Sequence, residues 1–488
     1  MKYIETKLIV FLKTLSISEI SEFNKFLQSP FFKQSRDPLP LFNILKKYHP
    51  DFTSKEFNEE NIFKELYPDL KFTDKKSKDI FRTITSALFK AAEEFIFFSN
   101  VKEDKVLRNR VFLKELLNRD LTKYYEQYMH AALNELETDK TNSGDDFFEK
   151  YYLEKLNTRF YSLTLDLKKL YEHTNKSAEL ISTYFWLDLI RTAKVNILYG
   201  QRSNLNAGNN PAENLLETVN MEKVLNIYEN TPLYFQLCFN FYSFRCLKDS
   251  NENELYEKAK NMFLENRTVI SRYDKIFYYA DLVNIAVSRD ASLNDGLKRD
   301  ALMFLKLCIE DKAYKVSDED FMQPDFYRNV IITSVYVKDY PWMEYFINNY
   351  TSELKPEYRN NMEHYSRSLL YYGKGEFENS LEEISKVNYD LDYFKLDTKI
   401  LMLKIFYELS LYEQARSMTD TFKHFIKNSD RMPPEIKESY NNFLKYYSKI
   451  INMKTESKKD KSGILNNIIK NEKFIFQKSW LLDKSNQI

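Results

Sequence analysis

The chain is poor in the residues that interrupt regular backbone structure. Only seven glycines and twelve prolines occur among 488 residues. Strand-rich folds use glycine at turns and bulges, so this scarcity favours long helices joined by short connections. The three cysteines are too few for a disulfide framework and indicate a reducing compartment. We interpret them as small core residues: Cys238, Cys246 and Cys308.

The chain also lacks net charge and long hydrophobic runs. Basic and acidic residues both total 72, which removes any whole-chain attraction to nucleic acid or to an anionic membrane. The apolar run from Leu8 to Leu12 lies between Lys7 and Lys13, and is too short for a signal peptide or a membrane span. We therefore expect a cytoplasmic protein that does not insert into a membrane.

What the chain does contain is helical periodicity. Hydrophobic residues make up 43% and charged residues 30%, which is typical of a chain that folds. Apolar residues recur at three- and four-residue steps in most segments, as an amphipathic helix requires. Capping boxes at Ser16–Glu19 and Thr53–Glu56 predict that helices begin near both. Loops are predicted at Glu137–Asp146 and Gly200–Glu213. The predicted fold class is all-α.

A repeat appears when YYGKGEFENSLEEISKV, from Tyr371 to Val387, is aligned with the segment from Leu401. At an offset of 35 residues, Phe377 matches Tyr412, Ser380 matches Ala415 and Gly375 matches Ser410. A third copy places Lys338 at the turn, Tyr340 at the aromatic position and Met343 at the small-residue position. An aromatic two residues after a turn, then a small residue three further on, resembles the tetratricopeptide repeat family.

The resemblance implies a bacterial protein with an N-terminal helical bundle and a tetratricopeptide-like α-solenoid of helical hairpins. We divide the chain into the bundle (1–100), a middle helical region with loops (101–215), the solenoid (216–453) and a linker with a C-terminal helical tail (454–488). The concave surface of such a solenoid suits an extended peptide or a partner helix. The expected function is a non-catalytic scaffold or adaptor, with a protein or peptide partner that the sequence does not identify.

The family's inner-face geometry places four residues toward the groove: Tyr365, Tyr372, Lys404 and Tyr407. A core between repeats is the other interpretation of these aromatic residues. Two arginines are added because arginine and tyrosine dominate binding energy at interfaces: Arg245 and Arg359.

The sequence shows no pattern of a catalytic, cofactor or metal site. Gly373-Lys374-Gly375 lacks the spacing and the preceding strand of a phosphate-binding loop, so a hairpin turn is the better interpretation. The five histidines show no zinc-ligand spacing, and neither a nucleophile elbow nor a dinucleotide-binding glycine pattern occurs. We expect no enzyme activity, no cofactor and no metal.

The N-terminal region offers an alternative function. Ile62–Asp69, followed by a basic-faced helix from Thr73, resembles the helix-turn-helix of bacterial regulators that join a winged helix to tetratricopeptide-like repeats. This resemblance implies DNA binding by the segment from about 54 to 98. The chain after Phe98 continues into another helix and leaves no room for a wing, so a solvated basic stripe is preferred. The residues that would contact DNA are Lys75, Lys76, Lys78 and Arg82.

Overall fold

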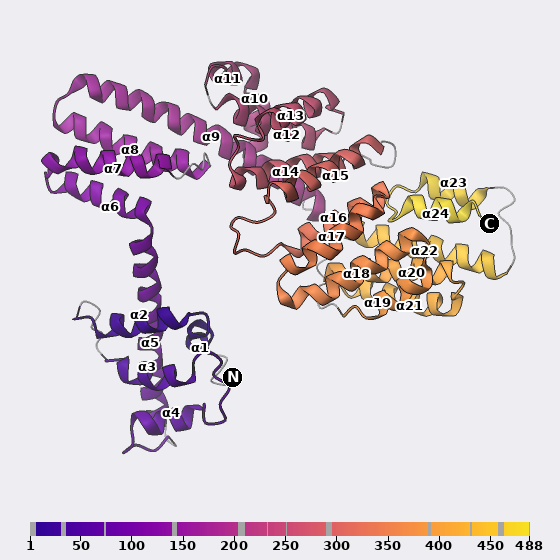
Figure 1. Ribbon diagram of the computed structural model, residues 1–488, viewed down its shortest axis with the longest axis horizontal. Helices are drawn as coiled ribbons and strands as arrows, with labels where there is room; N and C mark the ends of the chain where they lie inside the picture. Colours follow the sequence, from indigo (N-terminus) through magenta and orange to yellow (C-terminus); the bar gives the residue numbers. More distant parts are fainter. Residues whose placement is uncertain are drawn as a thin grey trace. The chain divides into compact units, whose positions relative to one another are not determined.

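The computed structural model confirms the all-α class. It describes residues 6–30, 36–72, 75–138, 144–203, 210–231, 233–249, 251–288, 295–388, 392–429, 432–456 and 463–487. Within these ranges the backbone forms α-helices throughout and no β-strand, apart from an isolated bridge between Met322 and Leu354 (Figure 1). Scarce glycine and proline thus correspond to long helices with short connections.

The chain divides into two compact units. Unit 1 comprises Met1–Thr138 and Lys155–Leu170, and unit 2 comprises Asp139–Glu154 and Tyr171–Ile488. The boundary predicted at residue 100 falls inside helix α5 (Lys75–Glu103), and the one predicted at 215 falls inside α10 (Pro211–Thr218).

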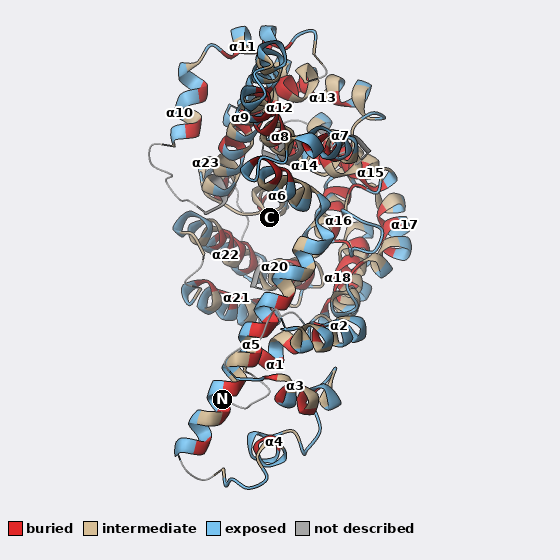
Figure 2. Cartoon of the chain, turned by 90° about the vertical axis from the view of Figure 1, so that its left-hand side faces the viewer, coloured by how far each residue is buried: buried red, intermediate tan, exposed pale blue. Residues whose placement is uncertain are grey.

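The N-terminal part of unit 1 is built on a core of phenylalanines. Phe23, Phe42, Phe63, Phe81 and Phe95 are all buried in one cluster, and α5 contributes its apolar face to it (Figure 2). The surrounding helices are α1 (Lys7–Leu12), α2 (Ile17–Gln28), α3 (Leu39–Leu45) and α4 (Glu59–Leu66).

The two predicted helix starts have different outcomes. At Ser16 the capping box forms as predicted, because the Ser16 and Glu19 side chains satisfy each other's backbone amides. The box predicted at Thr53–Glu56 is wrong. Helix α4 begins at Glu59 instead, where the Asn58 side chain accepts a hydrogen bond from the Asn61 amide.

The remaining helices follow one another as hairpins. Those that complete unit 1 and lead into unit 2 are α6 (Lys105–Asn118), α7 (Thr122–Thr138), α8 (Gly144–Leu163) and α9 (Leu167–Ser203). Unit 2 continues with α11 (Met221–Ile227), α12 (Tyr234–Lys248), α13 (Asn253–Asn266), α14 (Arg272–Ser288), α15 (Asp295–Glu310), α16 (Pro324–Val337), α17 (Tyr340–Tyr350), α18 (Pro356–Lys374), α19 (Phe377–Ser385), α20 (Asp392–Glu408), α21 (Tyr412–Lys427), α22 (Pro434–Thr455), α23 (Ile464–Asn471) and α24 (Lys478–Ser485). The last two confirm the expected C-terminal helices.

The three turn positions predicted by the repeat share one backbone conformation. Lys338, Gly375 and Ser410 are left-handed, with φ of 60°, 83° and 57°. After each turn an amide donates to the carbonyl five residues earlier, at 3.0, 2.9 and 2.8 Å respectively. These bonds satisfy the free carbonyls at the end of a helix. The hairpins α16–α17, α18–α19 and α20–α21 therefore follow the predicted alignment (Figure 1).

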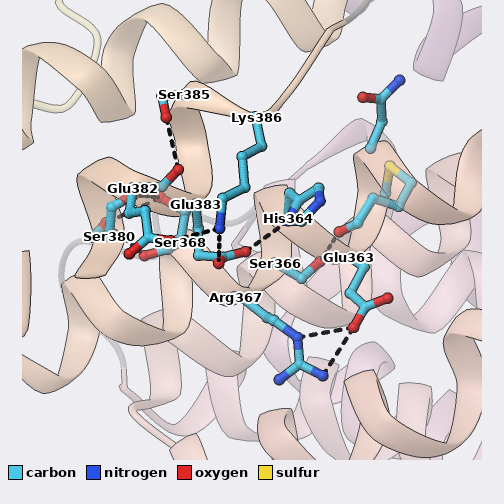
Figure 3. A network of polar contacts seen from close by, with 12 residues as sticks. Glu363, His364, Ser366, Arg367, Ser368, Ser380, Glu382, Glu383, Ser385 and Lys386 are labelled. Carbon is cyan, nitrogen blue, oxygen red and sulfur yellow. Dashed lines mark hydrogen bonds and ion pairs between the residues drawn. The ribbon is translucent and has the colours of Figure 1, made fainter.

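Close packing inside the α18–α19 hairpin depends on two small residues. Ser368 and Ser380 are fully buried, and each hydroxyl donates to the backbone carbonyl of the other residue, at 2.8 and 2.7 Å (Figure 3). Gly373 serves the contact with the preceding hairpin, because a Cβ there would lie 2.4 Å from Cε1 of Tyr340. Gly373 is thus a close-contact position, and Gly375 is a turn.

Replacing Gly375 with valine should destabilise unit 2 by about 1 to 2 kcal/mol, because a β-branched residue is strained at φ of 83°. Thermal unfolding of the full chain measures the loss. The matched control is Ser410→Gly, which relieves the same strain at the equivalent turn and should stabilise by about 0.5 to 1 kcal/mol. An unchanged stability of Gly375→Val would contradict the strain argument.

Candidate partner-binding site

Three of the six predicted partner-binding residues come together in the structure. Tyr372 on α18 and Lys404 and Tyr407 on α20 all contact the C-terminal segment, which Figure 1 shows in yellow. The family resemblance predicts that these three residues face an open groove. In the structure, the C-terminal segment of the same chain lies on them.

The other three predicted residues lie apart from this group. Tyr365 is only 2% exposed and packs with Ile384 and Leu401 between hairpins, as the core interpretation expects. Arg245 pairs with Glu252, and the Arg359 Nε donates to the Leu354 carbonyl at 2.8 Å. These local contacts orient both arginine side chains. Whether any of the six residues binds a partner stays a prediction.

Helix α24 is positioned by the segment that precedes it. The Phe474 carbonyl accepts a hydrogen bond from Asn442, and the Phe476 amide donates to the Ser439 carbonyl, both on α22. Gln477 is left-handed, with φ of 53°, so the chain turns there before α24 begins at Lys478. This turn directs Trp480 and Lys484 toward α18 and α20.

Trp480 is the central side chain of α24. Its indole stacks on Tyr447 at a centroid distance of 5.9 Å and meets the edge of Tyr407 at 5.4 Å. Its Nε1 donates to the Tyr372 hydroxyl at 2.8 Å. An indole that is surrounded by aromatic rings and has its one donor satisfied is typical of an interface anchor. We call Tyr372, Lys404, Tyr407, Glu408 and Tyr447 the α24 contact surface.

Lys404 is the most unusual group of this surface. Its ammonium donates to Oε1 of Gln477 at 2.5 Å and lies 5.9 Å from the ring centroids of both Tyr372 and Trp480. Burial lowers the pKa of Lys404 to about 7; nearby Glu408 opposes this shift and Lys484 adds to it. Among the described residues no carboxylate forms an ion pair with it.

Glu408 and Tyr407 complete the polar part of the α24 contact surface. Glu408 pairs with Lys484 of α24 at 2.9 Å, and both side chains are largely buried. The Tyr407 hydroxyl is buried and finds no hydrogen-bond partner among the described residues. Burial raises the pKa of Tyr407 to about 12. Beneath α24 the surface therefore holds one lysine, close to Lys484 of that helix, and one unsatisfied hydroxyl.

Replacing Lys404 with methionine should stabilise the protein near pH 7 by about 1 kcal/mol or more, because no charge then needs to be desolvated. It should also change the pH profile. In the folded state Lys404 loses its proton above about pH 7, whereas in the unfolded chain it keeps the proton up to 10.5. The unfolded state thus binds more protons in that window, so wild-type stability rises with pH there.

Thermal unfolding of both proteins at pH 6.5 and 9 tests this prediction. The increase in stability with pH that Lys404 causes should be absent from Lys404→Met. The control is Lys427→Met, which removes an exposed lysine of α21 and should leave the profile unchanged. A rise of equal size in wild type and Lys404→Met would contradict the assignment.

The same face continues along α16 and α20. Arg328 Nε donates to Oδ2 of Asp397 at 2.5 Å, which joins the first helices of two hairpins. Tyr336 lies two turns further along α16 and is 55% exposed, yet burial raises its pKa, and Gln477 contacts its hydroxyl. Tyr336 is thus an exposed aromatic residue beside the segment that leads into α24.

Sequence reasoning missed the residues that α24 contributes: Gln477, Trp480 and Lys484. The sequence predicts a C-terminal helical tail at 454–488 but not the surface that the tail contacts. Trp480 contacts Tyr372 across 108 residues of sequence, a separation at which no local pattern applies.

A buried polar cluster in unit 2 was also missed. Lys194 on α9 forms an ion pair with Asp281 on α14, and its ammonium also donates to Oδ1 of Asn240 on α12 at 2.8 Å. Burial lowers the pKa of Lys194, and the pair with Asp281 opposes that shift. The cluster links three helices of successive hairpins. We interpret it as a structural element of the core.

The residues that the alternative function predicts to contact DNA lie at the start of α5. Lys75, Lys76, Lys78 and Arg82 are exposed, and Arg82 lies 3.8 Å from Asp79. Helix α5 runs on to Glu103, Asp104 then caps α6, and residues 75–138 contain no strand that could form a wing. DNA binding stays a prediction that no contact in this region specifically favours.

Comparison of the chain with family models, curated proteins and solved structures finds no significant match. Within the described ranges no helix is long and apolar enough to cross a membrane, and no group of three or more His, Cys, Asp or Glu residues could hold a metal ion. Any functional statement therefore depends on the chain's own residues and contacts.

Proposed function

We propose that this chain is a non-catalytic, cytoplasmic bacterial scaffold of tetratricopeptide type, which binds a partner helix or peptide on the concave face of its C-terminal hairpins. The observation that supports the proposal is the docking of α24 on α18, α20 and α22 through an aromatic anchor, a cation–π contact and an ion pair. These are the interactions by which grooves bind helices. The contacts of the protein's own helix support the proposal of such a ligand.

An exposed aromatic residue beside α24 provides the test. Tyr336→Ala removes an exposed aromatic side chain beside Gln477 without emptying a core position. We expect the tagged full-length variant to recover at least fivefold less of a specific co-purifying protein from the native cell than wild type does. Its melting temperature should not change, because exposed substitutions alter stability little.

The matched control is Tyr345→Ala on α17, the second helix of the same hairpin. Tyr345 is 49% exposed, close to the value for Tyr336, but lies on the second helix of the hairpin and not on the first. It should recover the partner normally. Equal recovery by both variants would reject the concave face as the binding surface, and recovery of no specific partner by wild type would count against a scaffold.

A further inference from the structure

The contacts of α24 include features that a purely structural helix would not need. Lys404 and Lys484 are held close enough for the second to lower the pKa of the first, and Gln477 offers Lys404 a neutral acceptor only. The Tyr407 hydroxyl is left unsatisfied among the described residues. Apolar side chains at these positions would avoid the cost of burying charged and polar groups. The surface is better suited to a different ligand.

Few buried residues fix α23 and α24 in place. Helices α23 and α24 contain eight residues each, too few to be stable without their contacts. Each buries only two residues: Leu465 and Ile469 in α23, and Leu481 and Ser485 in α24. Removal of α24 would uncover three tyrosines, a residue type that is enriched in binding hot spots.

We propose that α24 is a resident self-ligand of its contact surface, and that a partner helix with an aromatic anchor and an acidic side chain in place of Gln477 displaces it. The acid would give Lys404 an ion pair at the position where Gln477 Oε1 now lies, 2.5 Å from its ammonium. The partner must also supply a cation in the place of Lys484, because Glu408 now pairs with that lysine of α24. This inference rests on the proposed function and adds the partner's chemistry to it.

The charges that face Lys404 support an acidic ligand. From its own helix they are Glu408 and the Tyr407 hydroxyl, from α18 the Tyr372 hydroxyl, and from α24 Lys484. Burial raises the pKa of Tyr372 as well, so both tyrosines are neutral near pH 7. A ligand carboxylate would therefore meet Lys404 and the cation that replaces Lys484, with Glu408 as the one opposing carboxylate, and it would restore the charge of Lys404.

Labelled peptides test displacement directly. The probes are residues 472–487 of this chain with a fluorophore, one with the native Gln477 and one with Gln477→Glu. Fluorescence anisotropy measures their binding to the full-length protein at pH 7. We expect at least tenfold tighter binding of the Glu peptide to a Trp480→Ala chain, whose own helix is loosened, than to wild type. Equal binding to the two proteins would overturn the self-ligand proposal.

A second comparison isolates the charge. The Glu peptide should bind the Trp480→Ala chain at least fivefold more tightly than the Gln peptide, and Lys404→Met in that background should abolish the difference. Equal affinities of the two peptides would overturn the acidic-partner part. Where Trp480→Ala fails to fold by circular dichroism, Lys484→Ala replaces it, since that variant keeps the indole and removes the contacts of Lys484 with Glu408, Asp483 and the Tyr407 ring. The same outcomes then apply.

The two proposals fail separately. Loss of partner recovery in Tyr336→Ala together with no peptide binding to any variant would retain the scaffold function and reject the self-ligand. Peptide binding as expected, with no partner recovered from cells, would retain the displaceable helix and reject the scaffold function.

Discussion

Replacing Asp281 with alanine is expected to destabilise unit 2 by about 3 to 5 kcal/mol, because it leaves the buried ammonium of Lys194 without a counter-charge. Both side chains are almost fully enclosed, and α9, α12 and α14 meet at this pair. The remaining acceptor, Asn240, is neutral. Removal of one partner of a buried pair costs far more than removal of both, because the surviving charge cannot reach water.

Hydrogen exchange of the full chain is the suitable measurement, because a protein of this size need not unfold in one step. Amides of α9, α12 and α14 should exchange faster in Asp281→Ala, while those of α1 to α5 should not change. The matched control is Lys194→Met with Asp281→Leu, which replaces both charges by apolar groups and should fall within about 1 to 2 kcal/mol of wild type. A double variant as unstable as the single one would contradict the charge argument.

Replacing Ser380 with leucine is expected to destabilise the α18–α19 hairpin by about 2 to 4 kcal/mol. The side chain is fully buried and its hydroxyl lies 2.7 Å from the Ser368 carbonyl, so three added carbons have no space. Overpacking of this kind costs about 1 to 3 kcal/mol. Loss of the reciprocal hydrogen bonds adds about 1 kcal/mol.

The repeat supplies the control for this substitution. Met343 is the equivalent residue of the preceding hairpin and is also fully buried, yet it is large. Met343→Leu conserves volume and should cost less than about 1.5 kcal/mol. Thermal unfolding of both variants compares the two positions. Similar losses of stability in the two variants would mean that the helices of the two hairpins are equally far apart. Ser380 would then not be required for the close approach of α18 and α19.

Most of the fold could be predicted because its signals are local. A left-handed turn is fixed by the residues within six positions of it. The 35-residue offset between Gly375 and Ser410 in the sequence repeat therefore predicted both turns correctly. The capping box at Ser16 is equally local. At Thr53 the same pattern was misleading, since Asn58 offered a competing cap nearer the apolar positions of α4.

The candidate site could be predicted only in part. Family geometry selected Tyr372, Lys404 and Tyr407 from the sequence, and the structure brings these three together. It could not indicate that Trp480 and Lys484 lie on them, because helical periodicity shows that a segment is amphipathic and not which surface it covers. Tyr365 follows the same periodic pattern and is buried in the core instead.

The sequence by itself determined the helical class, the hairpin turns and the absence of familiar catalytic patterns, because each follows from composition or from residues a few positions apart. Tertiary structure alone decided that Lys194 and Asp281 form a buried pair and that α24 occupies the surface around Lys404. The physical reason is chain separation: these contacts join residues 73 to 108 positions apart, and only packing of whole helices brings them together.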